Sequence, residues 1–441
     1  MGEDYEKRAT SKVAKRFVGL LIVCYFVAYL DRVNVGFAKL TMDSDLGISD
    51  TAFGFGAGIF FLTYFLFEVP SNLLFERFGA RLWIARIMFS WGLISGAMAF
   101  IPQIAAATGL SRVATFYLLR LLLGFAEAGF FPGIIFFLTL WVPSAYRARI
   151  IGYFMAAIPL SSALGTPVSA QLMELNGVAG FAGWQWLFIM EALPAIVMAV
   201  VMFQMLTDRP AEATWLRPDQ RTWLVERIAS ERAQQEAVRK FSLAGAFSSR
   251  TLWLITIAYF GNQMWSYAVS FFLPLIVRGL GVGTNWIGLL SGLPYLVALV
   301  AMNVWGWNSD RTGERTWHVA SAWLLSSAGM AVCILVGPGS PSVVMVGLTF
   351  AAMGPWAMAP AFWALPSALL TGTAAAGGIA MIGAVGQLGS WFGPTLFGLV
   401  KDATGSNNTA LLVLALAPVI STVLLVAAGH DRRMERIPSR G

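Results

Sequence analysis

Two charged side chains interrupt an otherwise apolar stretch, RLLLGFAEAGFFPG, which runs from Arg120 to Gly133. Arg120 and Glu127 are two helical turns apart, so a helix would present both on roughly one face, about 10 Å apart along its axis. A charge at the centre of a bilayer costs roughly 2.5 to 3.5 kcal/mol, and charges kept there usually face a bundle interior or an aqueous cavity. The spacing therefore indicates a site for anion binding or proton transfer. A structural ion pair between two helices is the alternative.

The composition indicates a membrane protein. Of 441 residues, 57% are hydrophobic and 12% are charged, against about 25% charged in an average soluble domain. Mean hydropathy is +0.69, and apolar runs long enough to cross a bilayer recur along the chain. We predict an all-α, multi-pass membrane protein. The chain has only two cysteines and two histidines, which argues against a metal site, a cofactor or an enzyme.

We expect twelve membrane-spanning helices in two bundles of six. They are predicted near 16–37, 52–75, 81–101, 113–140, 147–173 and 184–206, then near 250–278, 284–308, 316–336, 342–365, 374–400 and 408–429. The expected domains are an N-terminal bundle (1–206) that holds the proton-coupling charges, a cytoplasmic linker (207–249), and a C-terminal bundle with a short tail (250–441). The linker pattern from 219 to 240 predicts a surface helix that acts as a solvated connector.

The positive charges predict the orientation. Most of the 30 Lys and Arg residues fall in the termini, the linker and the loops that share a side with them. The other side holds only Lys39, Arg112, Arg278 and Lys401. Because Lys and Arg concentrate in cytoplasmic loops, we expect both termini to be cytoplasmic in a bacterial inner membrane. The net charge of +7 then requires no nucleic-acid partner, and we expect a monomer.

The two halves carry a repeated loop. NLLFERFGARLW (72–83) and GWNSDRTGERTW (306–317) stand at equivalent places of the two halves and match at five of twelve positions, counting the acids Glu76 and Asp310 as a match. Parallel repeats of this kind are one of the layouts that secondary transporters use. We expect these loops to act as conformational gates through Glu76, Arg77, Gly79, Arg81, Asp310, Arg311, Gly313 and Arg315.

The loop pattern resembles the G-x-L-x-D-R-x-G-R-K signature of the major facilitator superfamily, although the first copy has Asn72 for glycine and Glu76 for aspartate. The segments YLDRVNVGFA, FEVPSNLLFERFGARLWIARIM, RLLLGFAEAGFFPG and WQWLFIMEALPA look like the anion:cation symporter family. Within it, the chain is similar to bacterial tartrate, phthalate and hydroxyphenylacetate carriers. This resemblance implies proton-coupled uptake of an organic anion. It also implies that Asp31 and Glu127 are proton-coupling acids and that Arg32 and Arg120 are anion-facing or ion-pairing cations.

The residues suggest how coupling would work. A guanidinium matches a carboxylate bidentately, and a buried acid can exchange an arginine partner for a proton. We hypothesise that, without substrate, Arg120 or Arg32 pairs with Asp31. An incoming carboxylate would compete for the arginine, and the freed acid would take a proton. Glu127 would be a second proton acceptor.

For the other polar groups within the predicted spans, the sequence gives weaker evidence of a functional role. Glu68 is expected to support the first gating loop, and Glu191 to make a hydrogen bond to a neighbouring helix or, alternatively, to titrate. The C-terminal half has no clear ionisable group within its spans, so it is expected to supply neutral ligands. The candidate neutral substrate ligands of both halves are Tyr29, Asn262, Gln263, Tyr267 and Gln387.

Several functions remain open. The sequence is compatible with a tartrate-like dicarboxylate, an aromatic acid or a sugar acid as the substrate. An exchanger or an exporter of organic acids or drugs is the alternative within transport. A non-transporting membrane receptor is a further alternative, although only a short linker and tail are available as an output domain.

Overall fold

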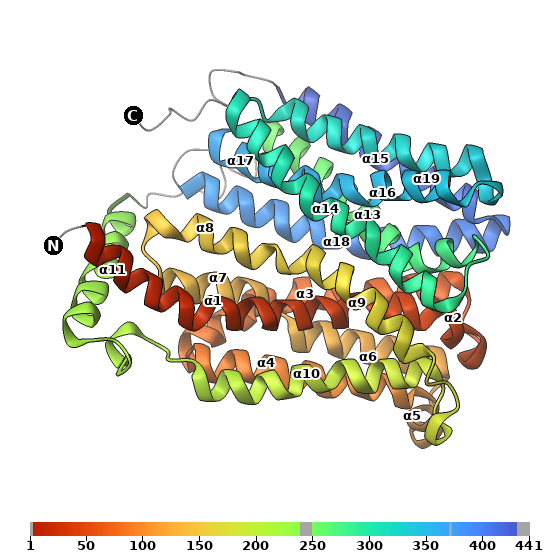
Figure 1. Ribbon diagram of the computed structural model, residues 1–441, viewed down its shortest axis with the longest axis horizontal. Helices are drawn as coiled ribbons and strands as arrows, with labels where there is room; N and C mark the ends of the chain where they lie inside the picture. Colours follow the sequence, from red (N-terminus) through yellow and green to blue (C-terminus); the bar gives the residue numbers. More distant parts are fainter. Residues whose placement is uncertain (1–2, 239–248, 370–372, 430–441) are drawn as a thin grey trace.

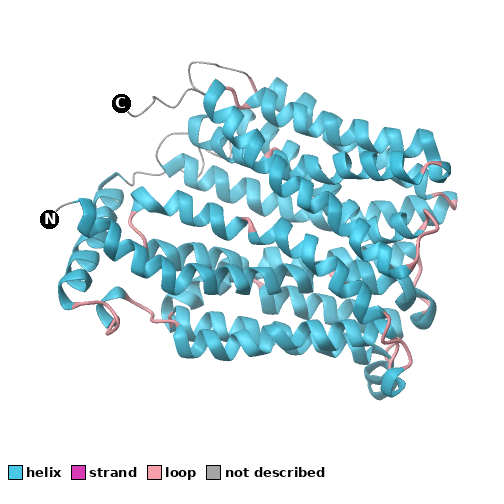
Figure 2. Cartoon of the chain, viewed as in Figure 1, coloured by secondary structure: helices cyan, strands magenta, loops and turns pink. Residues whose placement is uncertain are grey.

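The computed structural model describes residues 3–238, 249–369 and 373–429, and these residues form helices joined by short loops with no strand (Figure 2). The end of the predicted linker (239–248) and the predicted tail (430–441) lie outside the described residues. Ten segments of the described chain are long and apolar enough to cross a membrane. The remaining two predicted spans correspond to helices α13 and α18. The predicted all-α multi-pass fold is therefore confirmed.

The N-terminal half contains ten α-helices. They are α1 (Glu3–Val33), α2 (Val35–Leu46), α3 (Asp50–Phe78), α4 (Ala80–Ala97), α5 (Ile101–Thr108), α6 (Arg112–Glu127), α7 (Phe130–Trp141), α8 (Ser144–Met155), α9 (Ala157–Met173) and α10 (Gly183–Met205). Short 3-10 helices lie at Met98–Phe100 and Val178–Gly180. Several predicted spans are thus divided: the segments predicted as single helices over 113–140 and 147–173 are α6 with α7 and α8 with α9.

The connector and the C-terminal half follow. A 3-10 turn at Pro210–Glu212 leads to α11 (Pro218–Val238), and the second half contains α13 (Arg250–Arg278), α14 (Thr284–Thr312), α15 (Thr316–Val336), a 3-10 turn (Gly337–Gly339), α16 (Pro341–Ala357), α17 (Ala359–Leu369), α18 (Thr373–Thr404) and α19 (Asn407–Ala427). In Figure 1 the two halves lie one above the other, with the helices along the long axis. The start of α1 and helix α11 lie at one end of the bundle, here called the terminal end.

The halves pack together toward the other end, here called the opposite end. The main contacts between them join α3 to α18, α9 to α14 and α2 to α13. Glycines allow close approach: a Cβ on Gly292 would lie 2.6 Å from the Ala163 carbonyl oxygen. Within the described residues, the hydrogen bonds, ion pairs and ring contacts between the halves lie between mid-bundle and the opposite end.

Helix α11 and the turn before it dock on the terminal end of the N-terminal half. Trp215 stacks on Trp141 with ring centres 5.6 Å apart, and the Arg16 guanidinium lies 4.8 Å from the Trp215 ring centre. The Tyr5 hydroxyl donates to an Asp219 carboxylate oxygen at 2.8 Å, and this bond lowers the pKa of Asp219. The connector is thus attached to one half and is not solvated on all sides.

Candidate functional site

The Arg32 guanidinium and the Glu127 carboxylate form a buried salt bridge between α1 and α6. Only 6% of Arg32 and 2% of Glu127 is exposed. The central carbon of the guanidinium lies 5.3 Å from the ring centre of Phe60 and 5.2 Å from that of Tyr64. Burying an ion costs several kcal/mol, so removing either partner leaves an unfavourable charge. A competing anion or a proton at this pair therefore changes the energy of the bundle.

The backbone leaves helical geometry directly after Glu127, which is the last residue of α6. Ala128 has dihedrals of φ −53° and ψ 131°, and Gly129 has φ of +86°. Non-glycine residues are strained at such a φ, and a Cβ on Gly129 would also lie 2.7 Å from the Cβ of Ser71. Broken helices occur at the binding sites of many transporters. The prediction of one helix over 113–140 missed this break.

The Asp31 carboxylate is held by neutral donors. Trp91 Nε1 donates to it at 2.9 Å and Ser95 Oγ at 2.8 Å, both from α4, and the Asn34 amide lies at 3.4 Å. Asp31 is 2% exposed. Among the described residues no salt bridge joins Asp31 to an arginine, so the hypothesis that Arg32 or Arg120 pairs with Asp31 is wrong for this state. The reason is geometric: Arg32 contacts α3 and α6, whereas Asp31 bonds to α4.

Arg120 lies beside the salt bridge but bonds to the backbone. Its Nη2 donates to the Ala57 carbonyl oxygen at 2.6 Å, and its guanidinium carbon lies 5.1 Å from the ring centre of Phe60. The two predicted arginines, Arg32 and Arg120, thus share the ring of Phe60, and both are buried. All four predicted ionisable residues point into the protein and not toward lipid.

The predicted aromatic ligands lie where the halves meet. The rings of Tyr267 and Phe61 have centres 4.4 Å apart, and those of Tyr29 and Trp356 have centres 6.1 Å apart. Each contact joins one half to the other. Tyr29 precedes Asp31 by two residues on α1, so the helix that carries Asp31 and Arg32 also contacts the C-terminal half.

The predicted amide ligands are held within the C-terminal half. Asn262 Oδ1 accepts from Trp323 Nε1 at 2.8 Å, and Asn262 Nδ2 donates to Gln263 Oε1 at 3.3 Å. The buried Oε1 of Gln387 has no hydrogen-bond partner. A Cβ on its neighbour Gly386 would lie 3.3 Å from the Gln263 side chain. Gln387 is therefore the predicted amide that is free to accept a bond from a ligand.

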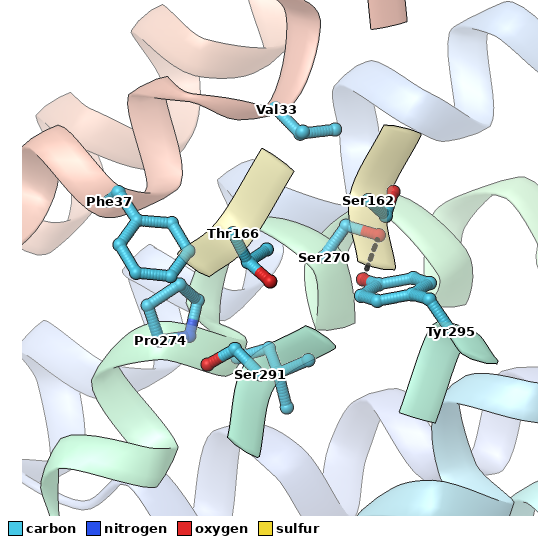
Figure 3. A pocket seen from close by; sticks show the side chains of 9 residues that line it. Val33, Phe37, Ser162, Thr166, Ser270, Pro274, Ser291 and Tyr295 are labelled. Carbon is cyan, nitrogen blue, oxygen red and sulfur yellow. Dashed lines mark hydrogen bonds between the residues drawn. The ribbon is translucent and has the colours of Figure 1, made fainter. Parts of the chain in front are cut away.

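A small hydroxyl-lined pocket lies between the halves (Figure 3). Its volume of about 10 Å³ is room for roughly one water molecule. Tyr295 donates to Ser270 Oγ at 2.9 Å, whereas the buried hydroxyls of Ser162 and Ser291 have no partner. Sequence reasoning missed these residues, because isolated serines in apolar helices have no distinctive spacing.

A charged cluster joins the halves at the opposite end. Asp50, in the first turn of α3, pairs with Lys39 Nζ at 2.7 Å and with Lys401 Nζ at 2.8 Å. Lys39 also pairs with Asp43, and the Thr51 amide donates to Asp402 at 2.8 Å. We call Lys39, Asp43, Asp50, Lys401 and Asp402 the opposite-end lock. From the sequence, Lys39 and Lys401 were predicted only as loop charges.

The repeated loops at the terminal end bond within their own halves. The Arg81 backbone amide donates to Asp208 at 2.7 Å, and its side chain donates to the Phe203 carbonyl. In the second copy Arg315 pairs with Asp310 at 2.6 Å. Gly79 and Gly313 both have positive φ, but their ψ angles of 159° and 18° differ, so the two loops do not share one backbone conformation. The gating role of these loops stays a prediction.

A buried charge site inside one of two packed helical halves is a feature that multi-pass membrane transporters share. Residues 21–394 match the model of the Major Facilitator Superfamily, and the chain belongs to this family. The structure is similar to that of a bacterial homologue of the human lysosomal transporter Spinster in an inward-facing, unoccupied conformation, with a TM-score of 0.77, 14% identity and 100% coverage of both chains. At this identity the likeness concerns the fold.

Two relatives illustrate the range of names among similar chains. A protein of Agrobacterium vitis named "Putative tartrate transporter" is 45% identical over 421 residues, or 96% of this chain and 91% of its own. A "Quinolone resistance transporter" of Acinetobacter baumannii is 37% identical over 96% of this chain and 95% of its own. The family consists of transporters, so the chain is not an enzyme.

Proposed function

We propose that this protein is a proton-coupled symporter that imports a small organic anion by alternating access. The Arg32–Glu127 salt bridge carries the proposal. A substrate carboxylate competes with Glu127 for the Arg32 guanidinium, because the guanidinium binds either carboxylate in the same way. The released Glu127 is buried without its cation and takes up a proton. Substrate and proton are thereby bound together.

The contacts between the halves support an inward-facing state. We place both termini in the cytoplasm, because Lys and Arg are concentrated at that end. The opposite-end lock and the helix pairs α3/α18 and α9/α14 then close the external side. In the cycle, the lock would open on the external side while the repeated loops join the halves on the cytoplasmic side.

A hydroxylated carboxylate is the substrate class that we favour. Arg32 and Arg120 supply positive charge, Gln387 supplies a free acceptor, and the pocket supplies unpartnered hydroxyls. The name of the Agrobacterium vitis relative is consistent with this class. An exporter or exchanger of organic acids or drugs is the second candidate, favoured by the name of the Acinetobacter baumannii relative.

Transport by purified protein in proteoliposomes tests the proposal. Radiolabelled tartrate, succinate, phthalate and gluconate are offered with the outside acidic, and lumenal pH is recorded with a trapped dye. We expect accumulation of a hydroxylated acid above equilibrium, with acidification of the lumen that depends on substrate. If uptake is the same with and without the pH gradient, or if the lumen becomes alkaline as substrate enters, the protein uses a different mode of transport.

A further inference from the structure

A third buried acid, Glu191 on α10, belongs to the same half as Asp31 and Glu127 and has no place in the cycle proposed above. Glu191 is 2% exposed. Ser169 Oγ on α9 donates to its Oε1 at 2.6 Å, whereas its buried Oε2 has no hydrogen-bond partner. A buried carboxylate oxygen without a donor is costly. A proton on Oε2 would remove this cost by turning the oxygen into a donor.

Asn34 connects Glu191 to Asp31. Its Nδ2 lies 3.4 Å from Asp31 Oδ1, and its side chain also interacts with the Glu191 carboxyl group. The buried Asn34 Oδ1 has no partner either. Two acceptor oxygens without donors, Glu191 Oε2 and Asn34 Oδ1, therefore occur in one polar cluster. One proton on Glu191 would let the carboxyl donate to the amide oxygen and satisfy both.

The surrounding charges leave Asp31 as the ionisable neighbour of Glu191. Helices α1, α2, α4 and α9 pack against α10. Asp31 of α1 interacts electrostatically with Glu191, and α9 presents Ser169. The charged side chains of α2 are engaged elsewhere, Lys39 with Asp43 and Asp45 with Trp184 at 2.7 Å. Arg81 and Arg86 of α4 lie near its start, at the terminal end.

We propose that Asp31 and Glu191, bridged by Asn34, form a two-carboxyl unit that binds one proton in common during transport. Two neighbouring buried carboxylates resist double ionisation, so the pair holds its last proton more tightly than either acid would alone. Glu191 is a positioning residue here: it acts through Asp31 and does not touch the substrate. The inference rests on the proposed proton-coupled function and adds a second proton-binding unit to it.

The pH dependence of uptake by reconstituted variants tests the pair. Glu191→Gln keeps the shape and the bond from Ser169 but removes the shared charge, so the pH of half-maximal uptake should fall by about one unit or more. Ser169→Ala removes the donor that stabilises ionised Glu191, so the midpoint should rise by about one unit. Glu174→Gln, an exposed acid just after α9, is the matched control and should leave the profile unchanged.

Opposite shifts distinguish a shared proton from a structural role. A merely structural Glu191 would change the yield or the maximal rate and leave both midpoints where they are, and this result would overturn the inference. If Glu191→Gln does not fold, the pH midpoint of the Ser169→Ala variant alone tests the shared proton. If wild-type protein does not accumulate substrate under a pH gradient, the proposed function fails first. If it does and neither midpoint moves, only the shared-proton inference fails.

Discussion

Arg32 on α1 and Glu127 at the end of α6 form an ion pair inside the N-terminal half, while the adjacent Asp31 is held by Trp91 and Ser95 on another helix. The two predicted proton-coupling acids, Asp31 and Glu127, thus lie in different surroundings, although Asp31 is adjacent in sequence to the arginine that pairs with Glu127. Glu127 has a cation as its partner, and the proposed cycle has a substrate carboxylate compete for that cation. Asp31 has neutral donors and a second acid, Glu191, in its cluster. This separation suggests two protonation events in the cycle.

Arg32→Lys should weaken substrate binding. Lysine keeps the charge that neutralises Glu127 but loses the planar two-donor fork, so we expect KM to rise about 10- to 100-fold, equivalent to about 1.4 to 2.8 kcal/mol. Concentration-dependent uptake in proteoliposomes measures this. Arg112→Lys, whose guanidinium bonds only to the Asp45 carbonyl among the contacts described, should behave like wild type. An unchanged KM in Arg32→Lys would show that Arg32 does not contact the anion.

Asp50→Asn should open the opposite-end lock, because it removes the carboxylate that Lys39 and Lys401 share, and Lys401 is the member from the other half. We expect a cysteine at Ser291, placed in a background with Cys24 and Cys333 replaced by alanine, to react about tenfold faster with an external thiol reagent. That factor corresponds to about 1.4 kcal/mol of relative stability between the two states. Equal labelling with and without Asp50→Asn would show that the lock does not hold the halves together.

The pocket hydroxyls should select hydroxylated substrates. Ser291→Ala and Tyr295→Phe each remove one hydroxyl from the pocket wall, and a neutral hydrogen bond contributes about 0.5 to 1.5 kcal/mol. We therefore expect the preference for tartrate over succinate, as a ratio of kcat/KM, to fall about 2- to 12-fold. Ser327→Ala, which removes a buried hydroxyl bonded to the Ala415 carbonyl, is the control. A constant ratio would place substrate hydroxyls elsewhere.

Trp215→Ala should detach the connector from the N-terminal half. The indole stacks on Trp141 and lies under Arg16, and an aromatic pair contributes about 0.5 to 1.5 kcal/mol beyond burial. We expect the unfolding temperature in detergent to fall by several degrees and Trp215→Phe to restore most of the loss. An unchanged melting temperature in the alanine variant would mean that the docking of α11 adds no stability.

The sequence predicted the fold well because long apolar segments are a strong signal of membrane-spanning helices. Predicted spans such as 250–278 and 316–336 coincide with α13 and α15. The break after Glu127 was missed, because a hydrophobic run gives no sign of the dihedrals that Ala128 and Gly129 adopt. Gly129 and Pro132 in GFFPG were the available signal.

The sequence identified which charged residues lie inside the helices but not which partners they contact. Arg32, Arg120 and Glu127 were selected because charges in apolar helices are costly, and that argument needs no tertiary structure. Which acid each arginine contacts depends on how α1 is rotated, and one residue along a helix changes the direction of a side chain by about 100°. Asp31 and Arg32 therefore face different helices, which spacing alone did not reveal.

Counterflow and gradient-driven uptake by Glu127→Gln test the central claim most directly. Glutamine is nearly isosteric and cannot carry a proton, so the variant should still exchange internal for external substrate but should not concentrate it under an inward proton gradient. Wild-type protein in matched vesicles should do both. If Glu127→Gln concentrates substrate in response to the pH gradient as wild type does, the role of the Arg32–Glu127 pair in coupling is contradicted.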